Sequence, residues 1–255
     1  MKRASLSVII ICKNEERVIS ETLHSVYNWA DEIIVLDSGS KDRTVEISKK
    51  YTEHVYETDW PGYGRQKNRA LEKATCEWIL SVDADEVVTD RLKIEIDQVL
   101  SHNSKYNGYK IPVKLFYFGK YIRSVLKRKP LILFKRGFGG FTEPAVHEAV
   151  RVTGRTSKIS KGCILHNSYE SLPHQLEKLN KYAVLSATDK HKNNISTTLS
   201  SAFIHSIWAL FKDLFLYLSI LDGWRGILLS AIHAQYTFNK YAFLKSLKYQ
   251  SKDNG

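Results

Sequence analysis

Cysteine is scarce in this chain of 255 residues, and its three cysteines, Cys12, Cys76 and Cys163, stand far apart. No two of them have the spacing of a metal-binding or redox pair. We therefore expect reduced thiols and a cytoplasmic location. Cys12 and Cys163 lie in apolar runs, so we expect them to be small core residues rather than reactive ones.

The chain also lacks a long uninterrupted apolar run. A membrane-spanning helix needs about 20 mainly apolar residues, and the richest apolar region, 203–238, is broken by charged residues. The N-terminus is basic, but the apolar stretch Leu6–Cys12 is short and leads directly into polar residues, so we expect no signal peptide. The composition, 43% hydrophobic and 25% charged, is that of a globular protein.

Acidic residues are almost absent between Lys105 and Lys161, where 14 lysines and arginines accompany only two carboxylates, Glu143 and Glu148. This segment carries a charge of +12, whereas the whole chain carries +11. Such a basic face attracts nucleic acid, anionic lipid or a phosphorylated substrate, although it is also compatible with a merely solvated surface. No nucleic-acid-binding motif is present, so we expect no nucleic-acid partner.

The first hundred residues alternate between strand and helix patterns. Strands are expected at Leu6–Cys12, Glu32–Asp37, His54–Tyr56 and Trp78–Val82, with helices between them. This alternation predicts an α/β fold with a parallel sheet covered by helices on both faces. Ligands of such sheets bind at the carboxyl ends of the strands. Three of these strands have polar residues at their carboxyl ends. These are Asn14 and Glu15 after the first strand, Asp37 at the end of the second, and Asp83 and Asp85 after the fourth.

The pattern changes after Gly108. Further strands are expected at Gly108–Val113, Leu131–Lys135 and Ile159–His166, and a helix over Ser171–Lys192. Residues 200–249 are predicted to be helical, with aromatic and basic residues interleaved. This region suits either an interfacial membrane anchor or a helical pair that packs on the core or forms a dimer. We expect one domain over 1–195, with a nucleotide-binding half (1–104) and an acceptor-side half (105–195), followed by a helical region (196–255).

Two carboxylates, Asp83 and Asp85, flank a single residue directly after an apolar strand. Oxygen ligands of this kind suit Mg²⁺ or Mn²⁺ rather than zinc. An ion held there would neutralise a diphosphate leaving group and act as a Lewis acid. His166, at another expected strand end, is a candidate to complete the metal or diphosphate site.

Two further motifs suit a nucleotide. Asp37 ends an apolar strand, and its carboxylate can accept hydrogen bonds from a nucleobase or a ribose, while Ser40 and Asp42 fit the cap of the next helix. Arg65 and Lys67 follow a glycine-containing turn, where they can bind phosphate at a helix start. The turn is neither a dinucleotide fingerprint nor a P-loop.

Glu148 is our candidate general base. A carboxylate among so many cations stays ionised at neutral pH, and it can accept the proton of an acceptor hydroxyl. The neighbouring His147 is expected to orient substrate or to be structural, because no second histidine follows at the spacing of a zinc protease.

These motifs together resemble glycosyltransferase family 2. The resemblance is carried by the strand before Lys13-Asn14-Glu15-Glu16, by Asp37-Ser38-Gly39-Ser40, by Gln66-Lys67-Asn68 and by Asp83-Ala84-Asp85-Glu86. Val146-His147-Glu148 and the segment from Leu221 to Gly226 are similar to the lipopolysaccharide core β-1,4-glucosyltransferases of that family.

The resemblance implies a GT-A fold, a Rossmann-like nucleotide-diphospho-sugar transferase domain, and an inverting single displacement. It implies that Asp37 contacts the base of a nucleotide such as UDP and that Asp83 and Asp85 hold metal and diphosphate. Asn14, Glu15, Arg65 and Lys67 complete the expected nucleotide-sugar site.

The implied donor is UDP-glucose, and the implied acceptor is a phosphorylated lipid oligosaccharide at the anionic inner face of the cytoplasmic membrane. A polyprenol phosphate acceptor, a peptide acceptor and a non-catalytic membrane-surface protein are the alternatives.

Overall fold

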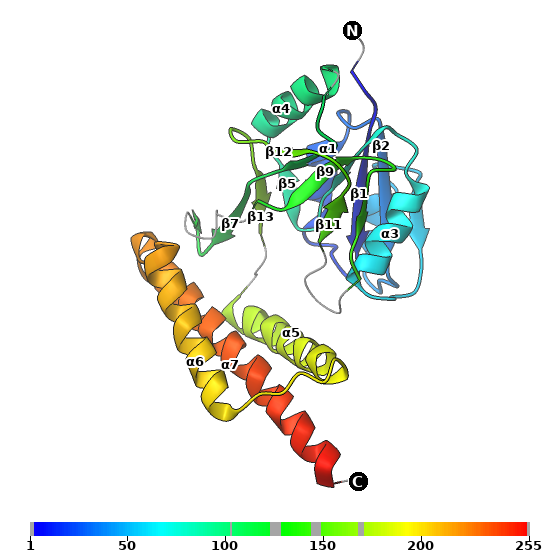
Figure 1. Ribbon diagram of the computed structural model, residues 1–255. Helices are drawn as coiled ribbons and strands as arrows, with labels where there is room; N and C mark the ends of the chain where they lie inside the picture. The colour runs from blue at the N-terminus through cyan, green and yellow to red at the C-terminus, as the bar shows by residue number, and fades with distance from the viewer. Residues whose placement is uncertain (1–2, 103, 123–128, 144–148, 168–170, 254–255) are drawn as a thin grey trace. The chain divides into compact units, whose positions relative to one another are not determined.

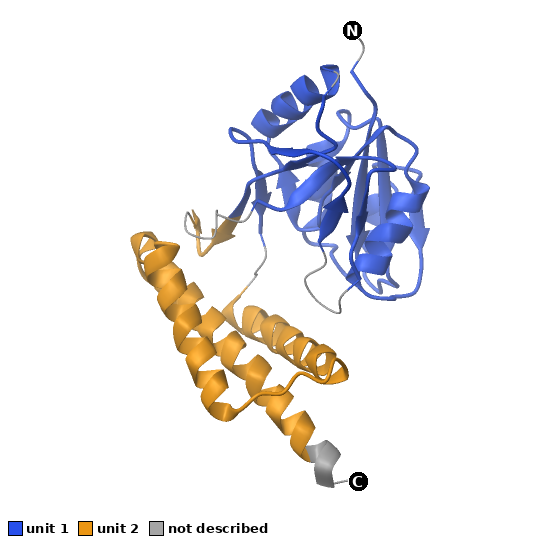
Figure 2. Cartoon of the chain, in the orientation of Figure 1, with its two compact units in different colours: residues 1–114, 128–143, 148–167 blue, residues 115–127, 144–147, 168–255 orange. Residues whose placement is uncertain are grey.

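The computed structural model of the protein describes residues 3–102, 104–122, 129–143, 149–167 and 171–253. The chain forms two compact units (Figure 2). Unit 1 contains residues 1–114, 128–143 and 148–167, and unit 2 contains residues 115–127, 144–147 and 168–255. The sequence boundary after residue 195 differs from this division, because the helix over 172–192 packs with the later helices in unit 2.

Unit 1 begins with the expected alternation (Figure 1). Its strands and helices up to residue 101 are β1 (Leu6–Cys12), α1 (Ile19–Val26), β2 (Glu32–Asp37), α2 (Thr44–Ser48), β3 (Val55–Glu57), α3 (Tyr63–Lys73), β4 (Trp78–Ser81), β5 (Glu86–Val88) and α4 (Asp90–Ser101). The later strands of unit 1 are β6 (Gly108–Lys110), β9 (Leu131–Lys135), β10 (Gly139–Phe141), β11 (Val150–Val152), β12 (Thr156–Lys158) and β13 (Ile164–His166).

The main sheet has seven strands in the order β12-β6-β9-β4-β1-β2-β3. Strands β1 to β4 pair in parallel, as expected, with Cys12 at the end of β1 opposite Asp37 at the end of β2. The later strands make the sheet mixed, because β9 lies antiparallel between β4 and β6. The smaller pairs β5–β13 and β10–β11 are also antiparallel.

Strand β1 is buried on both faces, which explains its continuous apolar sequence. Leu6, Val8 and Ile10 pack with side chains of α1 and α4. Ile9 and Ile11 pack on the other face with α3 and with β9. Each such side chain contributes about 1.5–3 kcal/mol by leaving water. The carboxyl ends of β1, β2 and β4 are thereby held side by side.

Unit 2 is mainly helical. Its elements are the strands β7 (Val113–Tyr117, which starts in unit 1) and β8 (Lys120–Tyr121), the helices α5 (Leu172–Lys192), α6 (Leu199–Phe211) and α7 (Trp224–Asp253), and between α6 and α7 a π-helical turn, η2 (Lys212–Leu216), and a 3-10 turn, η3 (Ser219–Asp222). Ser171 caps α5, as the sequence predicts, by accepting a hydrogen bond from the His174 amide. Helix α7 packs against both α5 and α6.

Candidate active site

The loops after β1 and β2 are joined by hydrogen bonds. The Asn14 amide donates to the Ser40 hydroxyl at 2.8 Å, and the Glu15 amide donates to the Thr44 hydroxyl at 2.7 Å. In return the Lys41 amide donates to the Asn14 side-chain oxygen at 2.8 Å. Asn14 has φ of 56°, a left-handed conformation that asparagine tolerates better than most residues. The polar strand ends expected from the sequence therefore meet.

Asp37 is completely buried at the end of β2. One carboxylate oxygen accepts hydrogen bonds from the amides of Gly39 and Ser40, at 2.9 and 2.7 Å, and the other accepts one from the Ser40 hydroxyl. These contacts shape the turn after β2. A direct contact of Asp37 with a nucleobase stays a prediction, and it requires one carboxylate oxygen to exchange the Ser40 hydroxyl for the base.

The expected capping role of Ser40 is wrong. Helix α2 begins only at Thr44, so the Ser40 hydroxyl is too far along the chain to cap it and bonds Asp37 and Asn14 instead. Asp42 does act near the helix start, because it accepts a hydrogen bond from the Thr44 amide at 3.1 Å.

The acidic turn, Asp83 to Glu86, connects β4 to β5. It is closed by two hydrogen bonds, because the Glu86 amide donates to the Asp83 carbonyl at 3.0 Å and the Asp83 amide donates to the Glu86 carboxylate at 2.9 Å. The Thr22 hydroxyl on α1 donates to the Ala84 carbonyl at 2.7 Å. Glu86 is buried, whereas the side chain of Asp83 is half-exposed. The turn is therefore a fixed element that presents Asp83 and Asp85.

Each aspartate of the turn has a cationic partner from a different element. Lys67 on α3 places its Nζ 2.8 Å from Asp83 Oδ1, and His166 at the end of β13 places its Nε2 3.1 Å from Asp85 Oδ2. The β5–β13 pairing sets the second contact, since His166 lies opposite Glu86. The structure thus brings together Lys67, Asp83, Asp85 and His166, four of the residues that the sequence singled out.

The acidic turn perturbs the ionisation of its neighbours. Burial, and then the negative charge of Asp83, raise the pKa of Glu86 to about 8. Burial lowers the pKa of His166, but the hydrogen bond and charge of Asp85 outweigh this and raise it to about 9. Two perturbed groups beside one turn are typical of a functional site.

Three consecutive residues of α3 contact three different neighbours. Gln66 is fully buried and donates to the hydroxyls of Ser38, at 2.9 Å, and Thr58, at 2.7 Å. Lys67 reaches the acidic turn, as described above. Asn68 pairs with the backbone of Phe141 in β10, accepting from its amide at 2.9 Å and donating to its carbonyl at 3.0 Å. Helix α3 therefore ties the end of β2, the acidic turn and β10 into one site.

Sequence reasoning named the Gln66-Lys67-Asn68 motif but gave a role only to Lys67. The signal for the others was their type, because amide side chains on a helix that must pack against a sheet need buried hydrogen-bond partners. The glycine-containing turn expected before Arg65 covers residues 61–64, and its placement of Gly64 is wrong, since α3 begins at Tyr63 and the backbone of Thr142 packs directly on Gly64.

Arg65, a predicted phosphate ligand, contacts a residue outside the acidic turn. The Arg65 Nε donates to Glu143 at 2.9 Å, and both side chains are exposed. That ion pair lowers the pKa of Glu143. Arg65 as a phosphate ligand therefore stays a prediction, which requires it to leave Glu143. Glu148 and His147 lie outside the described residues.

The side chains at the acidic turn are of the types that bind a divalent cation. The 3.1 Å between Asp85 Oδ2 and His166 Nε2 is that of a hydrogen-bonded ion pair, so His166 must release its proton before Nε2 can bind a metal. Among the described residues no group of three or more His, Cys, Asp or Glu side chains is placed to hold a metal. A pair of ligands still suits an ion that takes its other ligands from substrate phosphates and water.

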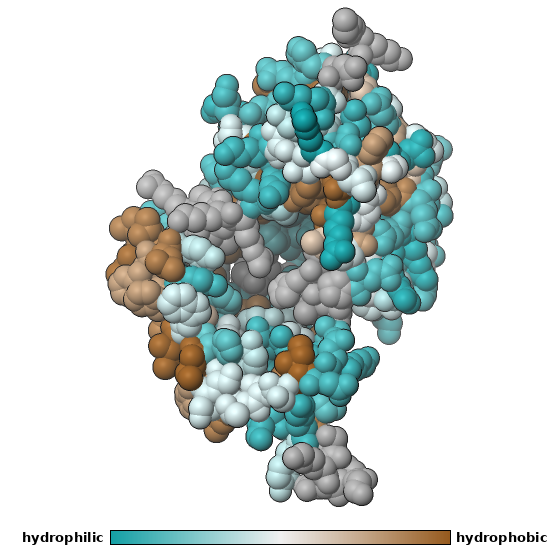
Figure 3. All heavy atoms as spheres, viewed as in Figure 1, coloured by the Kyte–Doolittle hydropathy of each residue, from teal (hydrophilic) through white to brown (hydrophobic). Residues whose placement is uncertain are grey.

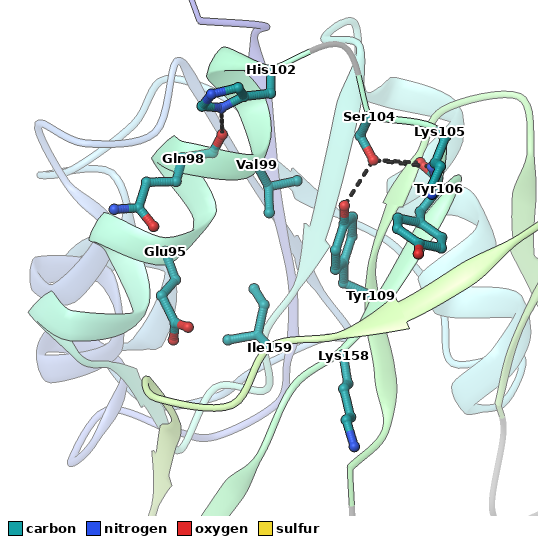
Figure 4. A pocket seen from close by; sticks show the side chains of 10 residues that line it. All are labelled: Glu95, Gln98, Val99, His102, Ser104, Lys105, Tyr106, Tyr109, Lys158 and Ile159. Carbon is teal, nitrogen blue, oxygen red and sulfur yellow. Dashed lines mark hydrogen bonds between the residues drawn. The ribbon is translucent and has the colours of Figure 1, made fainter.

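A hollow of about 390 Å³ lies elsewhere in unit 1, between α4, β6 and β12 (Figure 4). Two pairs of its polar groups are hydrogen-bonded: the hydroxyls of Ser104 and Tyr109 are 2.7 Å apart, and His102 Nδ1 is 2.7 Å from the Gln98 carbonyl. It contains none of the residues singled out above, so the strand ends remain the candidate site.

Comparison with known proteins gives three relevant similarities. The family model of glycosyl transferase family 2 matches residues 7–139. An uncharacterised glycosyltransferase of Rickettsia typhi is 30% identical over 97% of this chain and 89% of its own length. The lipopolysaccharide core biosynthesis glycosyltransferase LpsC of Rhizobium meliloti is 31% identical over 71% of this chain and 70% of its own length.

A solved structure, the mannosyltransferase PcManGT of Pyrobaculum calidifontis in complex with GDP-Man and Mn²⁺, is similar in fold. The TM-score is 0.58 at 14% identity, over 96% of this chain and 88% of that one. At this identity the likeness concerns the fold alone.

Proposed function

Because the chain belongs to glycosyltransferase family 2, we propose that it is a metal-dependent, inverting hexosyltransferase that moves glucose from UDP-glucose to a lipopolysaccharide inner-core acceptor. The fold is the expected α/β fold of GT-A type with a C-terminal helical region. The observation that carries the proposal is the acidic turn, where Asp85 and His166 lie 3.1 Å apart beside the Lys67–Asp83 pair.

We propose that the diphosphate of the donor binds at this turn. Asp85, together with His166 after its imidazole releases the proton that bonds Asp85, would hold Mg²⁺ or Mn²⁺, which would supply Lewis-acid stabilisation of the leaving diphosphate. An imidazole nitrogen is a softer ligand than a carboxylate oxygen, so this pair favours Mn²⁺ over Mg²⁺. Lys67 is only 11% exposed and adds a fixed positive charge near the leaving group, while its ion pair holds the carboxylate of Asp83 in place.

The nucleoside is placed at the neighbouring strand ends. The loops carrying Asn14, Glu15 and Asp37 are joined by the hydrogen bonds described above, which pre-organise them for a base and a ribose. Gln66 holds the end of β2 against α3, next to the residue that reaches the acidic turn. A nucleotide can thereby span from the β2 loop to the acidic turn.

Transfer proceeds in one displacement. The acceptor hydroxyl oxygen forms a bond to the anomeric carbon as the bond from that carbon to the diphosphate oxygen breaks, which inverts the configuration. Glu148 accepts the hydroxyl proton, and the diphosphate leaves with the electron pair. The charge of the surrounding segment supports this role, since a carboxylate among cations stays ionised.

The acceptor is assigned from similarity and charge. LpsC is described as a lipopolysaccharide core biosynthesis enzyme, and the segment 105–161 carries +12. A phosphorylated lipid oligosaccharide complements that charge. We place the protein at the inner face of the cytoplasmic membrane, as a peripheral protein.

A panel of nucleotide sugars tests the proposal. With Mn²⁺ and isolated inner-core acceptor, UDP-glucose should give the fastest transfer, and excess chelator should stop it. Glu148→Gln should keep donor binding and lose transfer, whereas the control Glu143→Gln should transfer normally. Faster turnover of another nucleotide sugar would show that UDP-glucose is not the preferred donor. Normal transfer by Glu148→Gln would show that another residue is the general base.

A further inference from the structure

Unit 2 exposes one extended apolar face. On α6 and η2 every fourth side chain forms a row, and the row is Leu199, Phe203, Ile207, Phe211 and Phe215. All five are at least 46% exposed, and the adjacent Ile204 and Trp208 are exposed at 66% and 54%. Figure 3 shows hydrophobic side chains gathered over this helix and the turn that follows it. Isolated exposed apolar residues are ordinary, but a contiguous row is not.

The turn between α6 and α7 continues this face. It exposes large apolar side chains, namely Leu216, Tyr217, Leu218, Ile220, Leu221 and Trp224. Leu218 has φ of 58°, a left-handed conformation that costs a non-glycine residue about 1–3 kcal/mol. The backbone of the turn is therefore strained at Leu218, and the side chain of this leucine is half-exposed.

The polar groups of the turn point inward. Ser219, Asp222 and Ser230 are buried, and the Ser219 hydroxyl lies 2.6 Å from that of Ser230 and donates to the Asp213 carbonyl at 2.8 Å. The backbone passes so close to Gly226 that a side chain there would meet the Ser219 carbonyl at 1.8 Å. The outer surface of the turn is apolar because its hydrogen-bonding groups are used internally.

The charges at this face are positive. Residues 199–230 contain two acidic residues, of which Asp222 is buried and Asp213 is 14% exposed and bonded to His233. The two basic residues flank the turn, since Lys212 lies over the Tyr217 ring at 5.4 Å and Arg225 over the Trp224 ring at 4.7 Å. Cations beside aromatic rings at the edge of an apolar face match the headgroup region of an anionic bilayer.

A second turn within unit 2 adds to the same face. Phe118, at the turn between β7 and β8, has φ of 45° and is 44% exposed. Its ring lies 5.6 Å from that of Trp224, and its carbonyl accepts a hydrogen bond from Arg225 Nε at 2.8 Å. The hairpin and the helical turn are therefore one surface.

The segment Leu199–Leu216 is, within the described residues, long and apolar enough by length and composition to cross a membrane. The structure favours a helix that lies along a membrane surface over one that crosses the membrane. Ala202 and Ala209 on its other side are buried, and the Ser206 hydroxyl donates to the Ala234 carbonyl of α7 at 2.8 Å. Helix α7 carries His233, Gln235 and Asn239 nearby, which a hydrocarbon environment would disfavour.

We propose that this face of α6, the α6–α7 turn and the β7–β8 turn is a membrane-docking surface that inserts on one side into an anionic phospholipid bilayer. The inference rests on the proposed function only for the lipid nature of the acceptor. Apolar side chains enter the outer part of the acyl layer, and Lys212 and Arg225 contact the headgroups.

Co-sedimentation with vesicles tests the surface without any sugar transfer. The purified full chain should bind phosphatidylglycerol vesicles more tightly than phosphatidylcholine vesicles. High salt should weaken its binding to the phosphatidylglycerol vesicles. Leu221→Asp and Ile207→Asp should each reduce binding about tenfold or more, comparable to the free energy of burying one leucine. The matched control is Ile94→Asp, which changes an equally apolar residue of α4 that is 59% exposed and should leave binding unchanged.

Fluorescence quenching tests the surface in the wild-type protein, so its result does not depend on whether a variant folds. Lipids brominated in the acyl chain should quench the wild-type protein, and Trp208→Phe with Trp224→Phe should remove most of that quenching. Equal sedimentation of Leu221→Asp and wild type, or no quenching, would overturn the proposal. A wild-type dimer that Leu221→Asp converts to monomers, without vesicle binding, would assign the face to a second copy instead. Binding of UDP should be unchanged in all these variants, so a failure here leaves the glycosyltransferase proposal standing.

Discussion

At the scale of single residues, the site depends on side chains that hold its elements together. The side-chain amide of Asn68 bonds both backbone groups of Phe141, as a neighbouring strand would. Glu86 closes the turn that presents Asp85. The sequence singled out Asp83, Asp85 and His166 by their expected strand ends and Lys67 by the turn before its helix, and the structure brings these four together. It named Gln66, Asn68 and Glu86 only within motifs and gave them no role, because contacts between distant elements are not visible in a local pattern.

Asn68→Asp should destabilise the protein. The new carboxylate would face the Phe141 carbonyl, which loses its donor, so we expect a loss of about 1–3 kcal/mol in the free energy of unfolding. Urea denaturation measures this. Glu143→Gln, which removes the exposed ion pair with Arg65 and alters the weak 3.4 Å contact with Asn68, should change stability by about 1 kcal/mol or less. Equal stability of Asn68→Asp and wild type would show that the pairing with β10 contributes nothing.

The thiols should be unreactive in the folded protein. Cys12, Cys76 and Cys163 are all buried, and burial, followed by the charge of Asp37, raises the pKa of Cys12. Because the thiolate is the reactive form, a chromogenic disulfide at pH 8 should label no thiol until denaturant is added, and then all three. Rapid labelling of the native protein would contradict the burial of these cysteines.

At the scale of elements, the sequence predicted best where a segment is buried along its whole length. Strands β1 and β2 have the bounds expected from their apolar runs. Helix α3 starts at Tyr63, although the glycines at 62 and 64 suggest a turn and a helix that begins only at Gln66. The antiparallel insertion of β9 was missed, since local patterns do not encode which strand lies beside which.

Gly64→Ala should test the contact between α3 and the end of β10. In an isolated helix this change would stabilise the helix by up to about 1 kcal/mol. In this protein the new Cβ would lie 2.0 Å from the Thr142 carbonyl oxygen. We expect a net loss of about 1–3 kcal/mol from overpacking, seen as a lower Tm. Gly140→Ala is the matched control, since its Cβ would meet only Asn68 Oδ1 at 3.8 Å. A higher Tm for Gly64→Ala would mean that the helix does not pack there.

At the scale of the whole molecule, sugar chemistry and membrane contact are assigned to different units. Unit 1 holds the acidic turn, and unit 2 holds the apolar face. The sequence left two explanations of the C-terminal aromatic residues open, a membrane anchor or helix packing. Helix packing is confirmed, because Ala202, Ala209, Ile232 and Tyr236 are buried in unit 2. The membrane anchor stays a prediction, which the exposed Trp208 and Trp224 support.

Leu221→Asp should therefore separate acceptor access from catalysis. With an acceptor embedded in anionic vesicles, transfer should fall about tenfold or more, in parallel with vesicle binding. With the same acceptor after removal of its acyl chains, Leu221→Asp and wild type should transfer at equal rates. A matching loss on the soluble acceptor would show that Leu221 acts on the fold or the site rather than on membrane contact.

Our proposal requires Asp85 and His166 to hold a divalent ion that binds the donor diphosphate. Calorimetric titration of UDP measures that binding. Wild type should bind UDP in Mn²⁺ and lose that binding in chelator, and Asp85→Ala should show the weak binding of the chelated protein whether or not Mn²⁺ is present. Asp90→Ala, which removes a carboxylate that is 93% exposed at the start of α4, is the control and should bind like wild type. Equal UDP affinity of wild type with and without Mn²⁺, or an unchanged Mn²⁺ response in Asp85→Ala, would contradict the account.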